Sequence, residues 1–302
     1  MAAVSSSRYQ HLTEVLSEVR HPGTVLKMLS DPRNDHIVAE GSLLLYYNPE
    51  TGQRGQFNGL LPVLALAFWP DDLRKTRALL RQRAKKLVKE RSLQTSKLVA
   101  PMFGQQHRKV PRPLTAGHRS SGMALGALVH KQLEDAVYLD RASFERKYTA
   151  MAPSTKAILQ YIQKRNWTLV ATEFCVSDEA IGVAARFDAV AVTPEGVPVF
   201  LEYKTGGKHS FCAEGPAMAS VLAGVLTDSD RNRALVQLAF SMLMLIKYFP
   251  YITTYEAYVL RPTEEEENRK GAVKAYPLEQ RFLATHGPAM YKAVFAMRSD
   301  KK

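Results

Sequence analysis

The sequence contains little cysteine and no long hydrophobic run. Cys175 and Cys212 are its two cysteines, which are too few for a four-cysteine zinc or iron–sulfur site. Their number favours reduced thiols in a reducing compartment over a disulfide framework. The longest apolar run, LLPVLALAFW at 60–69, is interrupted by Pro62 and is too short to cross a bilayer. We therefore expect no iron–sulfur cluster and no membrane span.

The N-terminus also lacks a secretory signal. It reads MAAVSSSRYQHLTEVLSEVR, which is rich in serine. Glu14 and Glu18 are unusual in a mitochondrial transit peptide. The sequence therefore predicts an intracellular protein.

Acidic residues are almost absent from the segment 73–131. It contains fifteen lysines and arginines but one acidic residue, Glu90, so it carries a charge of +14 in a chain whose net charge is +12. A basic region on a nearly neutral body is typical of a protein with a polyanion partner. A solvated basic face that only maintains solubility is the alternative. An anionic membrane surface is disfavoured, because the segment lacks a bulky apolar insertion face.

Hydrophobic periodicity and turn residues divide the chain into helices and strands. Pro22 and Gly23 break the first helical pattern, and turn residues at 193–196 predict a hairpin. We expect helices over 8–30 in two pieces, 59–69, 73–93, 120–139, 151–167, 231–249 and 277–296, strands over 168–176, 184–192, 197–205 and 253–262, and a strand or a short helix over 37–48.

This order of elements predicts an α/β or α+β fold, a sheet covered by helices. A basic segment that contains proline and glycine, at 105–120, predicts a loop or linker. We therefore expect a mainly helical, basic region over 1–104, a linker over 105–120, and a second region over 121–302.

The segment VFLEYKTG at 199–206 places two charges in an apolar strand. Side chains alternate along a strand, so Glu202 and Lys204 point to the same face. Asp188 lies in the middle of the preceding strand, and the hairpin brings it near Glu202. Buried charges are costly unless they are paired or bind something. The pattern predicts either an ion pair or half of a metal-dependent active site.

A helical histidine adds a further candidate ligand. His130 and Glu134 are spaced i,i+4 and share a helix face. His130 with Asp188 and Glu202 makes a hard ligand set that suits Mg²⁺ or Mn²⁺. Each residue also has a structural alternative, such as an ion pair of Glu134 with Lys131 at i−3.

Four motifs resemble those of the PD-(D/E)xK nucleases, specifically the RecB-like exonuclease branch with its viral and mitochondrial genome-maintenance members. The motifs are GALVH at 126–130, ARFDAVAV at 185–192, EYKTG at 202–206 and VQLAF at 236–240. They follow the order of the family and cover about 121–260. The chain departs from the branch in three places, with Glu202 where Asp is more frequent, Ala185 where Gly is usual and Ser241 where Tyr is usual.

The resemblance implies a restriction-endonuclease-like core, in which helices flank a mixed central sheet, and a metal-dependent reaction. Catalysis would use Asp188, Glu202 and Lys204. One or two Mg²⁺ or Mn²⁺ ions would bind His130, Asp188, Glu202 and the Tyr203 backbone carbonyl. Glu134 and Glu173 are uncertain or supporting members of the site.

The implied activity is a DNA exonuclease in replication, recombination or genome processing, acting in the mitochondrion, the nucleus or a viral replication compartment. The substrate would be single-stranded DNA or DNA with free ends, and RNA stays an alternative. A structure-specific endonuclease and a non-catalytic nucleic-acid-binding protein are the other hypotheses, and the oligomeric state is undetermined. The predicted nucleic-acid contacts are Gln237, Lys208, Arg74, Arg77, Arg81, Lys85, Arg108, Lys109, Arg112 and Arg119.

Overall fold

The structure is a computed structural model that describes residues 15–17, 19–31, 34, 37–40, 43–47, 54–69, 122–139, 141–148, 150–205, 211, 213–263 and 272–299. The predicted basic helix 73–93 and the linker 105–120 lie outside these residues. The same is true of nine predicted nucleic-acid contacts, which are Arg74, Arg77, Arg81, Lys85, Arg108, Lys109, Arg112, Arg119 and Lys208.

The described chain contains helices and strands that follow one another in groups. Its helices are α2 (Gly23–Leu29), α3 (Leu60–Phe68), α5 (Gly122–Tyr138), α6 (Arg141–Lys147), α7 (Pro153–Lys164), α8 (Asp230–Tyr248), α9 (Gln280–Ser299) and the 3-10 helix η3 (Ser220–Leu222). Its strands are β1 (Ile37–Glu40), β2 (Leu43–Tyr47), β3 (Arg54–Gly59), β4 (Thr168–Asp178), β5 (Val183–Val192), β6 (Pro198–Tyr203), β7 (Glu256–Thr263) and β8 (Ala272–Pro277).

These strands form one mixed sheet. Its order is β1-β2-β3-β5-β6-β7-β8, and β4 pairs with β5. β3 runs parallel to β5 and β6 runs parallel to β7, while the other pairs are antiparallel. The α/β class, with helices flanking a mixed sheet, is therefore confirmed.

The long strand β5 pairs with three others. β4 pairs along its whole length on one edge. On the other edge, β3 pairs with its first two residues and β6 pairs with its last four. Residues 185–188 therefore lie between two ladders, at the place where the sheet divides. Asp188 lies at this division.

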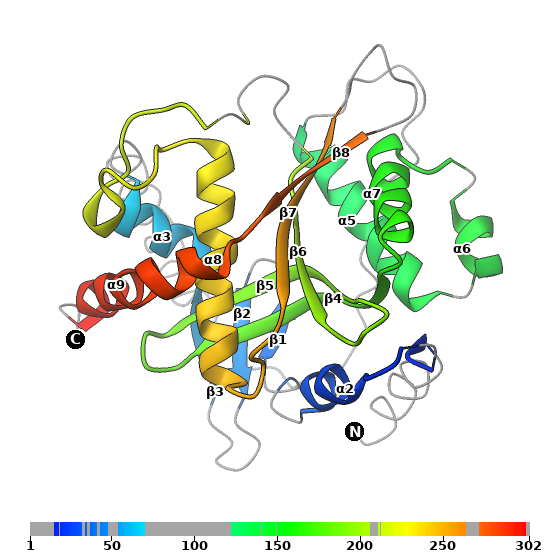
Figure 1. Cartoon of the computed structure of the whole chain (residues 1–302), viewed down its shortest axis with the longest axis horizontal. Coiled ribbons are helices and arrows are strands. Elements are labelled where there is room, and N and C mark those ends of the chain that lie inside the picture. The colour runs from blue at the N-terminus through cyan, green and yellow to red at the C-terminus, as the bar shows by residue number, and fades with distance from the viewer. Residues whose placement is uncertain are drawn as a thin grey trace, which may run out of the picture.

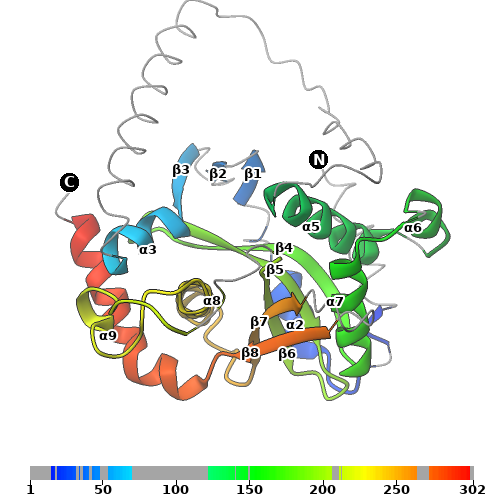
Figure 2. The ribbon, with the colours of Figure 1, turned by 90° about the horizontal axis from the view of Figure 1, so that it is seen from above.

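Helices cover both faces of the sheet (Figures 1 and 2). On one face, α5 and α7 pack over a core that contains Val129 and Leu201. On the other, α3, α8 and α9 pack over a larger core that contains Phe187 and Phe200. Phe200 and Leu201 are neighbours on β6 that point to opposite faces, as the alternation of a strand requires. The result is three layers around a buried sheet.

The predicted hairpin turn joins β5 to β6 and also holds the N-terminal segment. Gly196 has a φ of 90°, and a Cβ atom there would meet the carbonyl of His21. Both facts require glycine. The amide of Arg20 donates to the carbonyl of Pro194 at 3.0 Å. The turn therefore ties the start of the described chain to the hairpin.

The start of α8 is fixed by its cap. The Ser229 hydroxyl accepts a hydrogen bond from the Asn232 amide at 3.3 Å, and the Asn232 side chain donates to the Thr227 carbonyl at 2.9 Å. This is the N-cap arrangement that satisfies an otherwise unpaired backbone amide. It sets the phase of the helix, and so the face on which Gln237 lies.

Most predicted elements match the structure within a few residues. Segment 37–48 forms two strands, β1 and β2, rather than a helix. β3, β8 and α6 were not predicted. β3 (RGQFNG) follows a turn-rich sequence and has no run of apolar residues, while β8 is an edge strand with no fully buried residue. Neither carries the alternation that marks a half-buried strand.

The described part of 1–104 packs with the rest of the chain. β3 pairs with β5, and α3 contributes Leu64 and Phe68 to the core that contains Phe200. This part contains three strands as well as α2 and α3, whereas we expected a mainly helical region. The predicted boundary at 105–120 lies outside the described residues.

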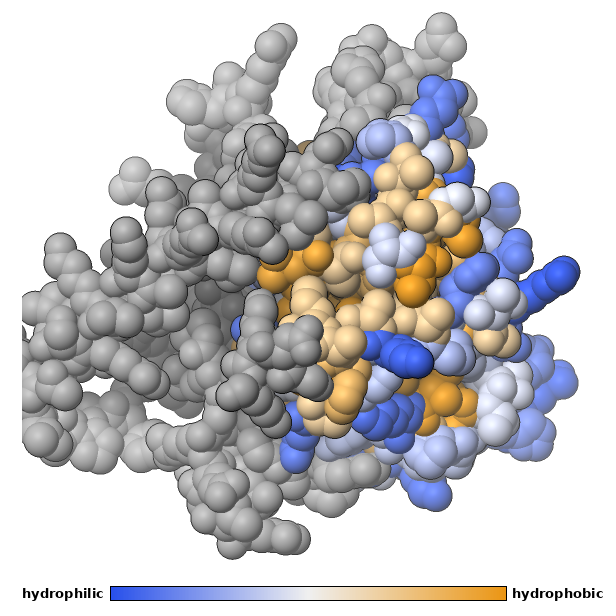
Figure 3. All heavy atoms as spheres, turned by 90° about the vertical axis from the view of Figure 1, so that its left-hand side faces the viewer, coloured by the Kyte–Doolittle hydropathy of each residue, from blue (hydrophilic) through white to orange (hydrophobic). Residues whose placement is uncertain are grey.

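Apolar side chains gather on the side of the molecule formed by α3, η3 and α9 (Figure 3). The exposed large apolar residues there include Leu61, Val221 and Phe295. Leu61 also lines a cavity beside α8.

In the described part of the chain, no helix is both long enough and apolar enough to span a membrane.

Asp135 is a buried charge that joins α5 to the end of α6. Its carboxylate lies 2.6 Å from Lys147 Nζ and 3.0 Å from Lys131 Nζ, and it accepts a 2.6 Å hydrogen bond from the Tyr148 hydroxyl. Burial raises the pKa of Asp135, but the hydrogen bonds from Lys147, Tyr148 and Lys131 outweigh it and lower the pKa. The ionised carboxylate therefore stabilises the fold.

Asp135→Asn should lower the free energy of unfolding by about 1–2 kcal/mol at neutral pH, because it removes a hydrogen-bonded buried charge whose lysine partners are partly exposed. The folded pKa is lower than the unfolded one. The contribution is therefore complete above the unfolded pKa of about 4 and is lost as the pH falls through the folded pKa. Urea unfolding of wild type and variant, at neutral pH and at about pH 3, measures this difference.

Glu134→Gln is the matched control, because it breaks a partly exposed pair with the same Lys131. It should change stability by less than about 0.5 kcal/mol. Equal losses in the two variants, or a loss in Asp135→Asn that does not shrink in acid, would contradict the assignment.

Candidate active site

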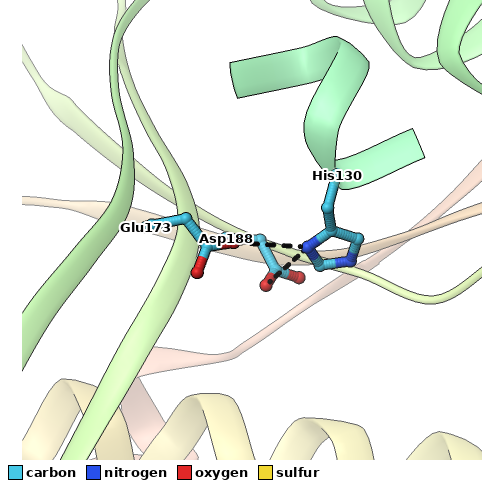
Figure 4. Close-up of side chains that lie close together, drawn as sticks. All are labelled: His130, Glu173 and Asp188. Carbon is cyan, nitrogen blue, oxygen red and sulfur yellow. Dashed lines mark hydrogen bonds and ion pairs between the residues drawn. The ribbon is translucent and has the colours of Figure 1, made fainter. Parts of the chain in front are cut away.

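Three side chains from three elements meet where the sheet divides (Figure 4). His130 comes from α5, Glu173 from β4 and Asp188 from β5. The His130 Nδ1 atom lies 3.5 Å from a Glu173 oxygen and 3.5 Å from an Asp188 oxygen. The contact with Glu173 is a long hydrogen bond, and the contact with Asp188 is an ion pair when the imidazole is protonated. One ligand atom from each residue lies within 4.8 Å of the other two.

Glu173 reaches this cluster through an unusual backbone conformation. Its φ is 52°, in the left-handed region that non-glycine residues rarely adopt and that costs about 1–3 kcal/mol. Its second carboxylate oxygen lies 2.7 Å from Arg186 Nη1. The residue before Glu173 pairs with the residue after Asp188, and the residue after Glu173 pairs with the residue before Asp188. Glu173 and Asp188 are therefore opposite one another in the β4–β5 ladder.

Gly126 allows α5 to come close to the end of β6. A Cβ atom at this position would lie 3.2 Å from the Thr205 hydroxyl oxygen, which is closer than ordinary packing allows. Gly126 is one helical turn before His130. The close approach of the helix at Gly126 therefore also brings His130 toward the sheet. The spacing Gly-x-x-x-His thus has a packing reason in this chain.

A second group of polar side chains lies beside the first. The Lys204 ammonium lies 2.6 Å from a Glu202 oxygen and 3.2 Å from the Gln237 side-chain oxygen. The Gln237 amide donates to the same Glu202 oxygen at 2.7 Å. The Glu202 side chain is 5% exposed. A buried carboxylate is thus balanced by one cation and one amide.

Tyr203 connects the two groups. Its backbone amide donates to an Asp188 oxygen at 2.5 Å, and its ring meets the His130 imidazole edge-on, with centroids 6.1 Å apart. Its phenolic oxygen is buried without a hydrogen-bond partner among the described residues. The amide contact fixes the Asp188 carboxylate at the last residue of β6.

The charges of the site shift one another's pKa values. Burial lowers the pKa of His130, but the Glu173 hydrogen bond and the charges of Asp188, Glu173 and Glu202 raise it to about 9. Burial and the charge of Glu202 raise the pKa of Asp188 to about 7, against His130 and Lys204, which lower it. Burial also lowers the pKa of Lys204, and the charges of Glu202 and Asp188 outweigh this and raise it. Clustered carboxylates therefore favour positive charge at this place.

The group of His130, Glu173 and Asp188 fits a divalent cation by its donor set, since Mn²⁺ accepts imidazole nitrogen and carboxylate oxygen and Mg²⁺ prefers carboxylates. The predicted ligand set shares His130 and Asp188 with this group. Glu202 lies near enough to raise the pKa of both, and one of its oxygens contacts Lys204. Glu173, expected only as an uncertain member, has the better placement.

The structure separates Glu134 from the cluster. Its carboxylate lies 3.0 Å from Lys131 Nζ, so the alternative reading, an i,i+3 ion pair, describes it.

The positions where the chain departs from the motifs have ordinary roles in the structure. Ala185 does not have a positive φ, so its position does not require glycine. Ser241 donates to the Gln237 carbonyl one helical turn back, at 3.0 Å, and is buried away from solvent. Cys175 is half-buried, and its thiol lies 3.5 Å from the Glu173 backbone carbonyl oxygen.

Sequence reasoning gave Glu173 too little weight. The available signal was a second hairpin, since residues 179–182 form a short turn between β4 and β5. Fixing that register places Glu173 opposite Asp188. An acidic residue opposite a catalytic candidate in an apolar sheet is a strong indication of a shared site.

Asp188→Asn and Glu173→Gln should each lower the affinity for Mn²⁺ by at least about tenfold, because each removes a charged ligand atom. Titration calorimetry with Mn²⁺ on the full chain measures this. Glu134→Gln removes a carboxylate from the same helix as His130, outside the cluster, and should leave the affinity unchanged. Unaltered Mn²⁺ binding by Asp188→Asn would exclude this cluster as the metal site.

Gly126→Val should also weaken Mn²⁺ binding, because the added methyl groups push α5, and His130 with it, away from Thr205. Ala127→Val adds a branched side chain to the exposed side of the same turn and is the control. The expected result is weaker binding in the first variant alone, with both variants folded by circular dichroism. If both bind Mn²⁺ like wild type, the close approach at Gly126 does not position His130.

Comparison with known proteins leaves the chain without a family assignment. The chain matches no family model and no curated protein.

Proposed function

We propose that this protein is a metal-dependent phosphodiesterase that acts on DNA as an exonuclease. The observation that carries the proposal is the placement of the Lys204 ammonium, 2.6 Å from Glu202, beside the cluster of His130, Glu173 and Asp188. A carboxylate-rich cluster next to a half-buried cation suits metal-assisted phosphodiester hydrolysis.

The arrangement of the elements supports the same reading. A helix carrying His130, a hairpin carrying Asp188 and Glu202, and a later helix carrying Gln237 converge on one point of a mixed sheet. This is compatible with the core of the PD-(D/E)xK nucleases, which the four sequence motifs resemble. The proposal therefore includes that fold, within the α/β class.

The charge of each side chain in the site determines its proposed role. A divalent cation, when bound, would lower the pKa of a water molecule and screen the charge of the phosphate. Asp188 and Glu173 supply negative ligand atoms, and His130 supplies a nitrogen. Lys204 is a cation at neutral pH, so it donates hydrogen bonds, orients a water molecule and stabilises charge on a phosphate oxygen. Gln237 and Glu202 hold the Lys204 ammonium in place.

DNA is the proposed substrate because of the charge of the chain. The net charge is +12, and the segment 73–131 accounts for it. Contacts between such a segment and phosphates give binding that depends on salt and little on sequence. The proposed contact residues in 74–119 and Lys208 lie outside the described residues.

Linear DNA carrying an end label, single- or double-stranded, should be degraded in Mg²⁺ or Mn²⁺ and left intact in EDTA. Lys204→Ala should reduce the rate by at least about 100-fold, because it removes a positioned charge from the reacting phosphate. Gel analysis of the labelled products measures the rate and shows which end is released first. Lys156→Ala, an exposed lysine on α7, is the matched control and should act like wild type.

A covalently closed circular DNA separates the two nuclease hypotheses, because an exonuclease leaves it whole and an endonuclease cuts it. An RNA oligonucleotide with the sequence of the linear DNA substrate tests whether the protein acts on RNA as well as on DNA. If wild type cleaves none of these substrates but binds them in a salt-sensitive manner, the nuclease proposal is wrong and a binding protein remains.

A further inference from the structure

A cavity opens directly beside Lys204 and Gln237, on the side of the sheet covered by α8. Its volume is about 390 Å³, within the range of small-molecule sites. Its polar lining residues include Lys204, Thr205 and Gln237, together with the acidic Asp230. Its aromatic lining residues include Trp69 and Phe211. An aromatic, half-apolar cavity thus adjoins the proposed reacting centre.

Arg233 forms a fixed platform in this wall. Its guanidinium lies 4.9 Å from the centre of the Trp69 ring. Asp228 holds it there through two hydrogen bonds, at 2.5 Å to Nε and 2.9 Å to Nη2. The Asp228 side chain is 2% exposed, whereas that of Arg233 is 28% exposed. A guanidinium plane fixed on its inner side by an aromatic ring can stack a planar ligand on its outer side.

The aromatic rings of the wall point to a ligand with a planar part. Trp69 is 6% exposed and lines the cavity beneath the Arg233 guanidinium. Phe211 is half-buried in the wall and lies under the Arg261 guanidinium, 4.8 Å from the ring centre. The wall therefore offers two aromatic rings, each with an arginine against it.

We propose that this cavity holds the base and sugar of one unpaired nucleotide next to the phosphate that is cut. The inference rests on the proposed function, because the cavity acquires this meaning only if a phosphate binds at Lys204. The base would stack against Phe211 and the Arg233 platform. The sugar and phosphate would lie toward Thr205, Lys204 and Gln237.

This site would select DNA whose end is unpaired. A base in a cavity of this size has left its stack and its partner strand, and the unstacking costs least in single-stranded or frayed DNA. Stacking of a base on an aromatic side chain tolerates any sequence, since every base has a π face. The expected preference is therefore for single strands, without preference for a base.

Tryptophan fluorescence can test binding without cleavage. Trp69 and Trp167 are the two tryptophans of the chain, and Trp167 lies in the core on the opposite face of the sheet. A Trp167→Phe protein, in EDTA, therefore reports from the cavity alone. Thymidine 5′-monophosphate should change the Trp69 emission with saturation, and inorganic phosphate should not.

Phe211→Leu in that background should weaken the binding of thymidine 5′-monophosphate by about tenfold, because it removes a stacking ring and keeps an apolar side chain. Phe295→Leu, an exposed phenylalanine on α9, is the matched control and should bind unchanged. No saturable change with the nucleotide, or equal affinity in Phe211→Leu, would overturn the proposal.

A second measurement avoids any change to a tryptophan. In otherwise wild-type protein with Ca²⁺ replacing Mg²⁺, a single-stranded oligonucleotide with 2-aminopurine at its end should lose fluorescence on binding, and Phe211→Leu should reduce that loss. Nucleotide binding without cleavage would leave the cavity assigned and defeat the nuclease proposal. Metal-dependent cleavage with no effect of Phe211→Leu on nucleotide or end binding would defeat the cavity proposal alone.

Discussion

The hydrogen bond from the Tyr203 amide to the Asp188 carboxylate is the contact on which the site depends. It lies where β5 loses one neighbour and has not yet met the next. A carboxylate buried there needs donors and positive charge around it. The backbone supplies one donor, and His130 and Lys204 supply charge. The position of these groups follows from the need to balance Asp188.

The site is built from side chains that come from both faces of the sheet. His130 belongs to α5 on one face, and Gln237 belongs to α8 on the other. His130 contacts Asp188, whereas Gln237 contacts Glu202 and Lys204. The proposed reacting centre and the proposed nucleotide cavity then share α8, since Gln237 and Arg233 are one helical turn apart. A single helix would position the phosphate and the nucleotide together.

Much of the fold could be predicted, and the failures have physical causes. The β5–β6 hairpin follows from its turn residues, and α8 follows from its apolar pattern. β8 was missed because it is an edge strand without a buried residue, and β3 was missed because its residues, RGQFNG, lack an apolar alternation although it pairs with β2 and β5. Glu173 was underestimated because its role depends on register and on a left-handed backbone conformation.

The sequence by itself determined the α/β class, the charged pair Glu202 and Lys204, and the hairpin that brings Asp188 to them. These are local properties, since alternation and turn chemistry act over a few residues. The tertiary structure alone decided that Glu173 joins His130, that Glu134 does not, and that Trp69 lies over Arg233. Those contacts join residues far apart in the chain, and only the packing of helices on the sheet fixes them.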